Sequence, residues 1–178
     1  MERSVIIAGF GGQGVILAGK ILALAGMDHG LEVTWLPSYG PEMRGGTANC
    51  TVVISDEPVG SPIVDEPTDL IAMNLPSLDK FEQVVAENGT IVANASLIDR
   101  SIKRGDVRAY MVDVHALAEK AGSSRAINMV ALGAYIKATG VLPLEVVKRA
   151  MARMLEEGGK GRFISMNENA INEGYNAV

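Results

Sequence analysis

The chain has 178 residues, a net charge of −5 and one cysteine, and these properties narrow the functions open to it. Its length suits one folded domain, and its negative charge, with basic residues scattered apart from Lys103 and Arg104, argues against a nucleic-acid groove. The single thiol of Cys50 excludes an internal disulfide, and also an iron–sulfur cluster held by this chain alone, since such clusters usually take four thiolates.

The first half of the chain is predicted to start with a strand, a helix and two more strands. In chain order, the apolar pattern places a buried strand at 4–9, a mostly apolar helix at 14–28, a strand at 31–37 and a strand or hairpin arm at 47–55. Residues 56–67 contain three prolines and several acidic residues, and they are expected to form an irregular connection.

The second half is predicted to alternate strands with helices and to end in a run of helices. In chain order these are a strand at 69–74, a helix at 78–87, strands at 90–96 and 106–114, and helices at 115–122, 126–140, 143–157 and, shorter, near 167–174. Together the elements predict an α/β fold. We expect a single three-layer domain over residues 1–178, with a mostly parallel, Rossmann-like sheet and a β-hairpin-type insertion near 47–55.

The helix expected at 126–140 is apolar nearly all round and therefore needs cover on more than one side. Either the sheet and the C-terminal helix cover it, or part of it meets another chain. We therefore expect the isolated chain to be an oligomer, such as a homodimer, or to expose an apolar patch on the order of several hundred Å².

The segment after the first predicted strand carries Gly9, Gly11 and Gly14 in the G-x-G-x-x-G arrangement. Glycines at a strand-to-helix turn permit a tight turn, let a ligand approach the backbone and allow close packing, while the helix N-terminus offers free N–H groups to an anion. The fingerprint alone is a weak signal. The alternative interpretation is a tight turn with no ligand.

NAD is disfavoured by the strand that follows the glycine loop. An NAD site of this type needs an Asp or Glu at the end of the second strand, roughly 20 residues after the loop, to bind the ribose 2′-hydroxyl. The strand at 31–37 ends instead in Leu36 and Pro37. Its one acidic residue, Glu32, lies near its start. The loop is therefore expected to bind an anion or a close backbone neighbour rather than an ordinary dinucleotide.

A glycine- and proline-rich loop after that strand carries a second group of candidate residues. Tyr39, Glu42 and Arg44 precede Gly45 and Gly46. Ligands of open α/β sheets gather at this carboxyl edge of the strands, where Arg44 could hold a phosphate or carboxylate through a bidentate fork. Alternatively, Glu42 and Arg44 pair locally to shape the loop. Gly45 and Gly46 are also expected to supply positive φ angles.

The remaining reactive residues show no catalytic pattern. His29 and His115 are lone histidines, and Cys50 lies within a predicted strand as a small core residue. We therefore expect no catalytic residue and no metal site. No apolar run reaches the roughly 18 residues that span a bilayer, and strand-like sequence follows residue 3 with no signal peptide. A cytoplasmic protein without membrane contact is expected.

Three motifs stand in order along the chain: GFGGQGV at 9–15, YGPEMRGG at 39–46 and INMVALGAY at 127–135. Together they resemble the γ subunit of the 2-oxoacid:ferredoxin (acceptor) oxidoreductases, and the resemblance runs from about residue 4 to residue 174. That family includes the pyruvate, 2-oxoglutarate and branched-chain oxoacid enzymes. Its fold, a single α/β domain, agrees with the fold predicted above.

The resemblance implies that the chain is one subunit of a larger complex. In such a complex, α and β subunits use thiamine diphosphate and Mg²⁺ to decarboxylate the 2-oxoacid. Iron–sulfur clusters, as in a ferredoxin-like δ subunit, pass the electrons to ferredoxin, and coenzyme A (CoA) takes the acyl group. This chain is expected to bind none of these cofactors alone, to pack on the thiamine subunits and to help form the CoA site.

The resemblance assigns CoA binding to the residues that stand in the matching motifs. They are Gly11, Gly12, Gln13, Tyr39, Glu42, Arg44, Gly45 and Gly46. Asn128, in the third motif, is expected to be an interface or loop-anchoring residue or, alternatively, a hydrogen-bonding residue at a helix N-terminus.

Substrate choice is expected to lie mainly in the partner chains, and 2-oxoglutarate or a related oxoacid is the expected substrate. Two alternatives remain open. One is the β subunit of an indolepyruvate ferredoxin oxidoreductase, which shares the same domain. The other is a nucleotide-sensing, Rossmann-like regulatory module that binds NAD or an adenine nucleotide at the glycine loop.

Overall fold

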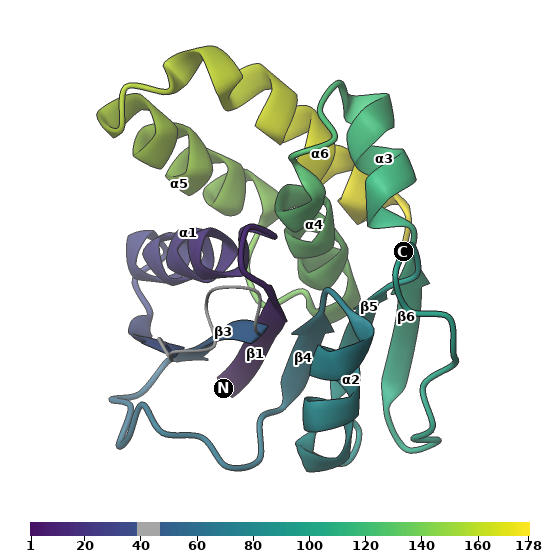
Figure 1. Cartoon of the computed structure of the whole chain (residues 1–178). Coiled ribbons are helices and arrows are strands. Elements are labelled where there is room, and N and C mark those ends of the chain that lie inside the picture. Colours follow the sequence, from purple (N-terminus) through teal and green to yellow (C-terminus); the bar gives the residue numbers. More distant parts are fainter. Residues whose placement is uncertain (39–46) are drawn as a thin grey trace.

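The computed structural model describes residues 1–38 and 47–178. Their strands form one sheet in the order β2-β3-β1-β4-β5-β6. Figure 1 labels β3, β1, β4, β5 and β6. The strands are β1 (Glu2–Phe10), β2 (Glu32–Ser38), β3 (Thr47–Ser55), β4 (Asp69–Ala72), β5 (Thr90–Asn94) and β6 (Arg108–Val112). β1, β4, β5 and β6 pair in parallel, whereas β3 runs antiparallel to both β1 and β2. The predicted parallel sheet with a hairpin-type insertion is confirmed.

Helices cover both faces of this sheet, which gives the three predicted layers (Figure 1). They are α1 (Val15–Asp28), α2 (Leu75–Phe81), α3 (Val114–Ala121), α4 (Ile127–Thr139), α5 (Leu144–Glu157) and α6 (Ile164–Asn176), with short 3₁₀ helices η2 (Glu82–Val84) and η3 (Gly161–Phe163). Among the helices of the described residues, none combines the length and the apolar composition that crossing a membrane requires.

β1 shows why the core has two unequal parts. Val5 and Ile7 point into the larger part, under α1 and α4, while Ile6 and Ala8 point into the smaller part, under α2. A strand that is buried on both faces reads as a continuous apolar run, and this is the pattern at the start of the sequence.

Several predicted boundaries were wrong; the strands expected at 69–74 and 90–96, for example, end at Ala72 and Asn94. Local hydrogen bonds explain two of the other differences. The helix expected at 78–87 begins at Leu75, because Asn74 accepts a hydrogen bond from Ser77 N at 2.9 Å and caps it; beyond Phe81 the chain continues as η2. The strand expected at 106–114 ends at Val112, since Asp113 caps α3 by accepting from Ala116 N at 3.2 Å. The short helix expected near 167–174 is α6, which has 13 residues.

α4 is buried almost completely, as its apolar sequence requires. α6 crosses it so closely that a Cβ on Gly174 would overlap the Val130 carbonyl and lie 3.0 Å from the Val130 Cα. The absence of a side chain at Gly133 and Gly174 allows this approach. The sheet and the C-terminal helix therefore cover α4, which was the first of the two predicted possibilities.

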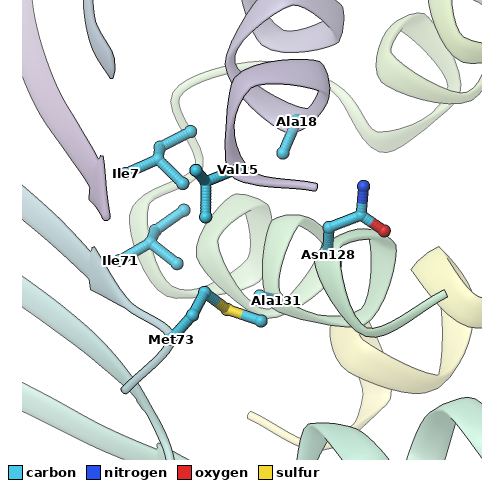
Figure 2. A pocket seen from close by; sticks show the side chains of 7 residues that line it. All are labelled: Ile7, Val15, Ala18, Ile71, Met73, Asn128 and Ala131. Atoms are coloured by element: carbon cyan, nitrogen blue, oxygen red, sulfur yellow. The ribbon is translucent and has the colours of Figure 1, made fainter. Parts of the chain in front are cut away.

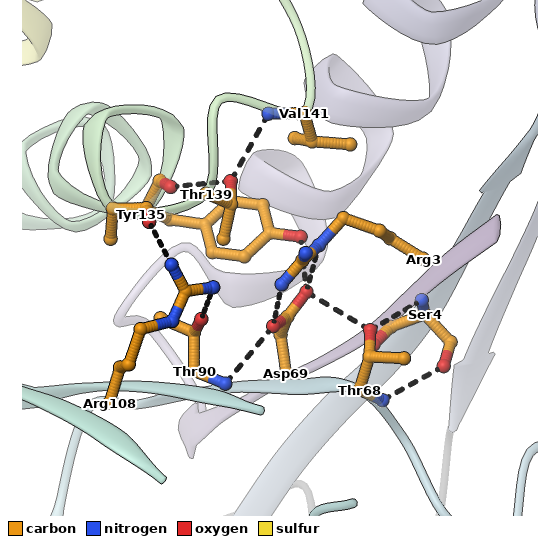
Figure 3. A network of polar contacts seen from close by, with 10 residues as sticks. Arg3, Ser4, Thr68, Asp69, Thr90, Arg108, Tyr135, Thr139 and Val141 are labelled. Carbon is orange, nitrogen blue, oxygen red and sulfur yellow. Dashed lines mark hydrogen bonds and ion pairs between the residues drawn. The ribbon is translucent and has the colours of Figure 1, made fainter. Parts of the chain in front are cut away.

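A polar network at the amino-terminal edge of the sheet links β1, β4 and α4 (Figure 3). Asp69 is fully buried; Arg3 donates to it through Nε at 2.9 Å and Nη2 at 2.5 Å, and the Tyr135 hydroxyl donates at 3.0 Å. Burial, together with the charge of Asp69, raises the pKa of Tyr135 well above its usual value. Burial alone would lower the pKa of Arg3, but the Asp69 carboxylate raises it through a hydrogen bond and its charge. This network lies at the sheet edge opposite the glycine loop.

Candidate functional site

The candidate site is built around the loop between Phe10, the last residue of β1, and Val15, the first residue of α1. Gly12 and Gly14 have φ angles of +91° and +73°, in the left-handed region that favours glycine. Gly14 is the N-cap of α1; among residues 1–38 and 47–178, no side chain caps this helix, and its first turn contains no acidic residue. The first N–H groups of α1 are therefore available to an external anion.

Gln13 fixes the loop on its β4 side. Its side-chain Oε1 accepts hydrogen bonds from Phe10 N at 2.6 Å and from Asn74 Nδ2 at 3.3 Å, and its Nε2 donates to Met73 O at 3.3 Å. A Cβ on Gly9 would lie 2.6 Å from Gln13 Oε1, so glycine at this position makes room for the amide. The fingerprint glycines therefore shape the loop as well as leaving space for a ligand.

Asn128 fixes the loop on its α4 side. Its Nδ2 donates to Gly14 O at 3.1 Å, and its Oδ1 accepts from Met129 N at 3.0 Å. Figure 2 shows Asn128 at the end of an apolar crevice that also contains Val15 and Met73 and has no room for a water molecule. The sequence left two roles open for Asn128, and its side chain fills both: it anchors the glycine loop, and it accepts a hydrogen bond at the N-terminus of α4.

Two clefts flank the loop. The sheet-side cleft, about 470 Å³ in volume, is lined by residues that include Phe10, Gly11, Lys20, Trp35 and Ala48. It combines two aromatic side chains and one ammonium group with the main chain of the glycine loop.

The helix-side cleft has a volume of about 590 Å³ and lies between the glycine loop and the N-terminal ends of α4 and α6. Its polar lining residues are Ser123, Arg125, Asn128, Lys160 and Asn167. Among the described residues, no Asp or Glu lines either cleft, and the cations Lys20, Arg125 and Lys160 form no ion pair. The electrostatics of this edge therefore favour an anionic ligand.

The predicted site residues divide into two groups. Gly11 and Gly12 are exposed at the tip of the loop, and Gln13 is partly buried beneath them. The other five predicted residues, Tyr39, Glu42, Arg44, Gly45 and Gly46, lie outside the described residues. Thr47, the first described residue after these positions, pairs with Phe10, the residue that precedes the glycine loop.

The structure adds cations that the sequence did not single out. Lys20 lies on α1, Arg125 precedes α4 and Lys160 precedes η3, and each is an isolated surface cation in the sequence. Only the packing of α1, α4 and α6 brings them to one edge of the fold.

Cys50 is not a reactive site. It is fully buried beneath Gly19 of α1, where a Cβ would overlap its Sγ, and burial raises the pKa of its thiol to about 12. A thiol in this environment is protonated and shielded from solvent, so it is a poor nucleophile. It is a small core residue, as the sequence indicated.

Strand order separates this domain from ordinary dinucleotide-binding folds. β3 lies between β1 and β2, so that Val52 pairs with Val5 on one side and with Trp35 on the other. The end of β2 is therefore one strand away from the glycine loop, and Glu32 lies at its far end. This geometry supports the argument against an NAD site.

Comparison with known proteins places the chain in a family. The family model described as pyruvate ferredoxin/flavodoxin oxidoreductase matches residues 4–177. The ketoisovalerate oxidoreductase subunit VorA of Methanothermobacter thermautotrophicus is 44% identical over 97% of this chain, although the match spans only 36% of VorA's length. The 2-oxoglutarate synthase subunit KorC of Methanothermobacter marburgensis is 34% identical, with 92% of each chain covered.

A solved structure agrees with these sequence relatives. The γ subunit of a keto/oxoacid ferredoxin oxidoreductase from Geobacter sulfurreducens has 29% sequence identity and a TM-score of 0.84, with 98% of this chain and 97% of that chain covered. The family model spans nearly the whole chain, and both KorC and the Geobacter γ subunit match it over more than nine-tenths of each chain. The chain therefore belongs to the pyruvate ferredoxin/flavodoxin oxidoreductase family.

Proposed function

We propose that this chain is the γ-type subunit of a multisubunit 2-oxoacid:ferredoxin oxidoreductase and that it contributes to the CoA site of the complex. The observation that carries the CoA proposal is the glycine loop between two clefts that contain cations and, among the described residues, no carboxylates. The names of the relatives, which are ketoisovalerate and 2-oxoglutarate oxidoreductase subunits, support the reaction class.

The reaction proposed for the complex is the CoA-dependent oxidative decarboxylation of a 2-oxoacid to acyl-CoA and CO₂. The sequence contains one cysteine, the buried Cys50, and cannot by itself supply the four thiolates that an iron–sulfur cluster usually takes; we assign the clusters to other subunits or domains, such as a ferredoxin-like δ subunit that reduces ferredoxin. Thiamine diphosphate and Mg²⁺ are assigned to the α and β subunits on which this chain packs. The role of this chain is therefore to bind and orient CoA rather than to carry out a chemical step.

CoA suits the site because it joins several phosphates to an aromatic base and a flexible arm. Phosphate oxygens can accept hydrogen bonds from the first turn of α1, and Arg125 and Lys160 can neutralise their charge. Phe10 and Trp35, on the sheet side of the loop, offer an apolar surface next to Lys20. Arg44 remains a proposed phosphate-binding residue from the sequence.

The substrate proposed is 2-oxoglutarate or a related oxoacid, chosen by the partner subunits. The chain spans about a third of the length of the ketoisovalerate relatives but nearly all of KorC, so the same domain occurs within longer polypeptides and as a separate chain. The cytoplasmic location and the homodimer expected of the isolated chain stay predictions.

Reconstitution tests this function. The chain alone should show no oxoacid-dependent reduction of a viologen dye, and addition of the α, β and δ partners should give activity that requires CoA. Parallel assays with 2-oxoglutarate, ketoisovalerate, pyruvate and indolepyruvate would separate the oxoacid types. Turnover by the chain alone, or a complex without it that keeps an unchanged KM for CoA, would overturn the proposal. A thermal shift with NAD but none with CoA would favour the nucleotide-sensing alternative.

A further inference from the structure

Both the oxygen and the nitrogen of the Gln13 side-chain amide form hydrogen bonds within the protein. Its oxygen accepts from Phe10 N at 2.6 Å and from Asn74 Nδ2 at 3.3 Å, and its nitrogen donates to Met73 O at 3.3 Å. Gln13 N also donates to Phe10 O at 3.1 Å, which closes the turn. The amide has few hydrogen-bonding positions left for a ligand.

The partners of Gln13 belong to a chain of buried amides along the carboxyl edge of the sheet. Asn74 caps α2 through Ser77 N, and Met73 O accepts a second hydrogen bond from Asn94 Nδ2 at 3.0 Å. Asn74 and Asn94 are each 1% exposed. Gln13 is therefore the point at which the exposed glycine loop is fastened to the rigid ends of β4 and β5.

We propose that Gln13 is a positioning residue, which acts on the ligand of the glycine loop through the main chain of Gly11 and Gly12 rather than by touching it. The identity of that ligand as CoA rests on the proposed function. A loop rich in glycine has many accessible backbone conformations, and its N–H groups bind an anion well only if one conformation is selected beforehand. The glycines themselves have no side chains with which to make that selection.

The hydrogen-bonding pattern requires an amide at position 13. A glutamate would keep the two acceptor contacts but would place a carboxylate oxygen against Met73 O, and its charge would also repel a phosphate. Gln13→Met is the cleaner variant, because it keeps the length of the side chain and removes every side-chain hydrogen bond without adding charge. Gln83→Met, at an exposed position on η2, is the matched control.

The test uses the assembled complex and two measurements. The first is steady-state kinetics, in which Gln13→Met should raise the KM for CoA about tenfold, the effect of losing one or two hydrogen bonds, and leave the KM for the 2-oxoacid and the kcat nearly unchanged. The second is hydrogen exchange of the amides of residues 10–15 without CoA, which should be much faster in Gln13→Met than in the wild type. Gln83→Met should change neither quantity.

The outcomes separate this proposal from the function on which it rests. An unchanged KM for CoA, or a raised KM with unchanged exchange in the ligand-free loop, would overturn the positioning role; the latter result would make Gln13 a direct contact. If CoA gives the wild-type loop no protection from exchange, the proposed CoA site is wrong. In that case the comparison of amide hydrogen exchange at residues 10–15 between the ligand-free Gln13→Met variant and the ligand-free wild type still decides whether Gln13 orders the loop.

Discussion

The side-chain amide of Asn128 donates to the carbonyl oxygen of Gly14, 114 positions earlier in the chain, at 3.1 Å and so joins the N-terminal ends of α4 and α1. Gly14 has a φ of +73°, and a Cβ at this position would lie 2.7 Å from Asn128 Cγ. Backbone conformation and the neighbouring side chain therefore both require glycine here. The first and third sequence motifs meet in this contact.

Gly14→Ala should destabilise the protein more than the same change at Gly140, which is the matched control. Both glycines have positive φ, at +73° and +63°, but a Cβ on Gly140 would meet no atom within 4 Å. Left-handed backbone costs alanine about 1–2 kcal/mol at either site, and displacement of Asn128 should add roughly 1–3 kcal/mol at Gly14. Urea unfolding of the two variants measures the difference. If Gly14→Ala and Gly140→Ala lost the same free energy of unfolding, Asn128 would have moved aside at no energetic cost.

Replacing Arg125 or Lys160 by glutamine should weaken CoA binding by the complex. Each change removes an exposed cation from the helix-side cleft, and the loss of about 1 kcal/mol expected for such a group corresponds to a roughly fivefold increase in the KM for CoA. Because both sites are exposed, the effect should shrink as ionic strength rises. Lys103→Gln, on the loop before β6, is a control of equal charge change. A similar effect from this control would point to net charge rather than to the cleft.

Tyr135→Phe should change how stability depends on alkaline pH. The folded pKa of Tyr135 is raised, by burial first and by the charge of Asp69 second, whereas the unfolded phenol ionises at a pKa of about 10. The hydroxyl therefore makes its full contribution to folding stability below pH of about 10, and this contribution is lost as the pH rises through the folded pKa. The variant should lose about 1–2 kcal/mol at neutral pH and show a shallower decline above pH of about 10.

Urea titrations of wild type and Tyr135→Phe at several pH values check this prediction, since other groups that ionise there are common to both proteins. Tyr110→Phe, on the edge strand β6, serves as the control for loss of a tyrosine hydroxyl. Parallel pH curves for wild type and Tyr135→Phe would contradict the role assigned to the buried phenol.

Cys50 should not react with a thiol reagent while the protein is folded. Burial raises the pKa of its thiol to about 12, and the side chain is shielded by α1, so both the thiolate fraction and the access of reagent are small at pH of about 8. Labelling with a disulfide reagent should proceed at the rate of unfolding and become fast in denaturant. Ser61→Cys, in an exposed loop, should label at once and provides the comparison. Fast labelling of Cys50 in the native protein would show that α1 opens locally.

Local sequence patterns predicted the strands well, since each is a short apolar or β-branched run. They were less accurate where a polar side chain decided a boundary, as Asn74 does for α2 and Asp113 does for α3. Such caps depend on the geometry of a few residues that a periodic pattern does not contain. The antiparallel arm at 47–55 could be predicted, but its position between β1 and β2 could not, because strand order depends on contacts distant in sequence.

The candidate site shows the same division. The glycine loop and the argument against NAD follow from neighbouring residues. Arg125 and Lys160 line one cleft only because of the packing of helices and strands. At the opposite edge of the sheet, the pairing of Asp69 with Arg3, 66 positions away, depends on the same kind of packing. No short window of sequence contains that information, and the cations look like ordinary surface residues.

The position of β3 has a consequence for attempts to redesign this domain. Neighbouring strands are about 4.8 Å apart, so an inserted strand moves the tip of β2 roughly 10 Å from β1, instead of roughly 5 Å. Grafting an aspartate onto the end of β2, the usual way to create specificity for a nicotinamide cofactor, would therefore put the carboxylate out of reach of a ribose anchored at the glycine loop. Conversion of this scaffold to a dehydrogenase would require removal of a whole strand rather than a point substitution.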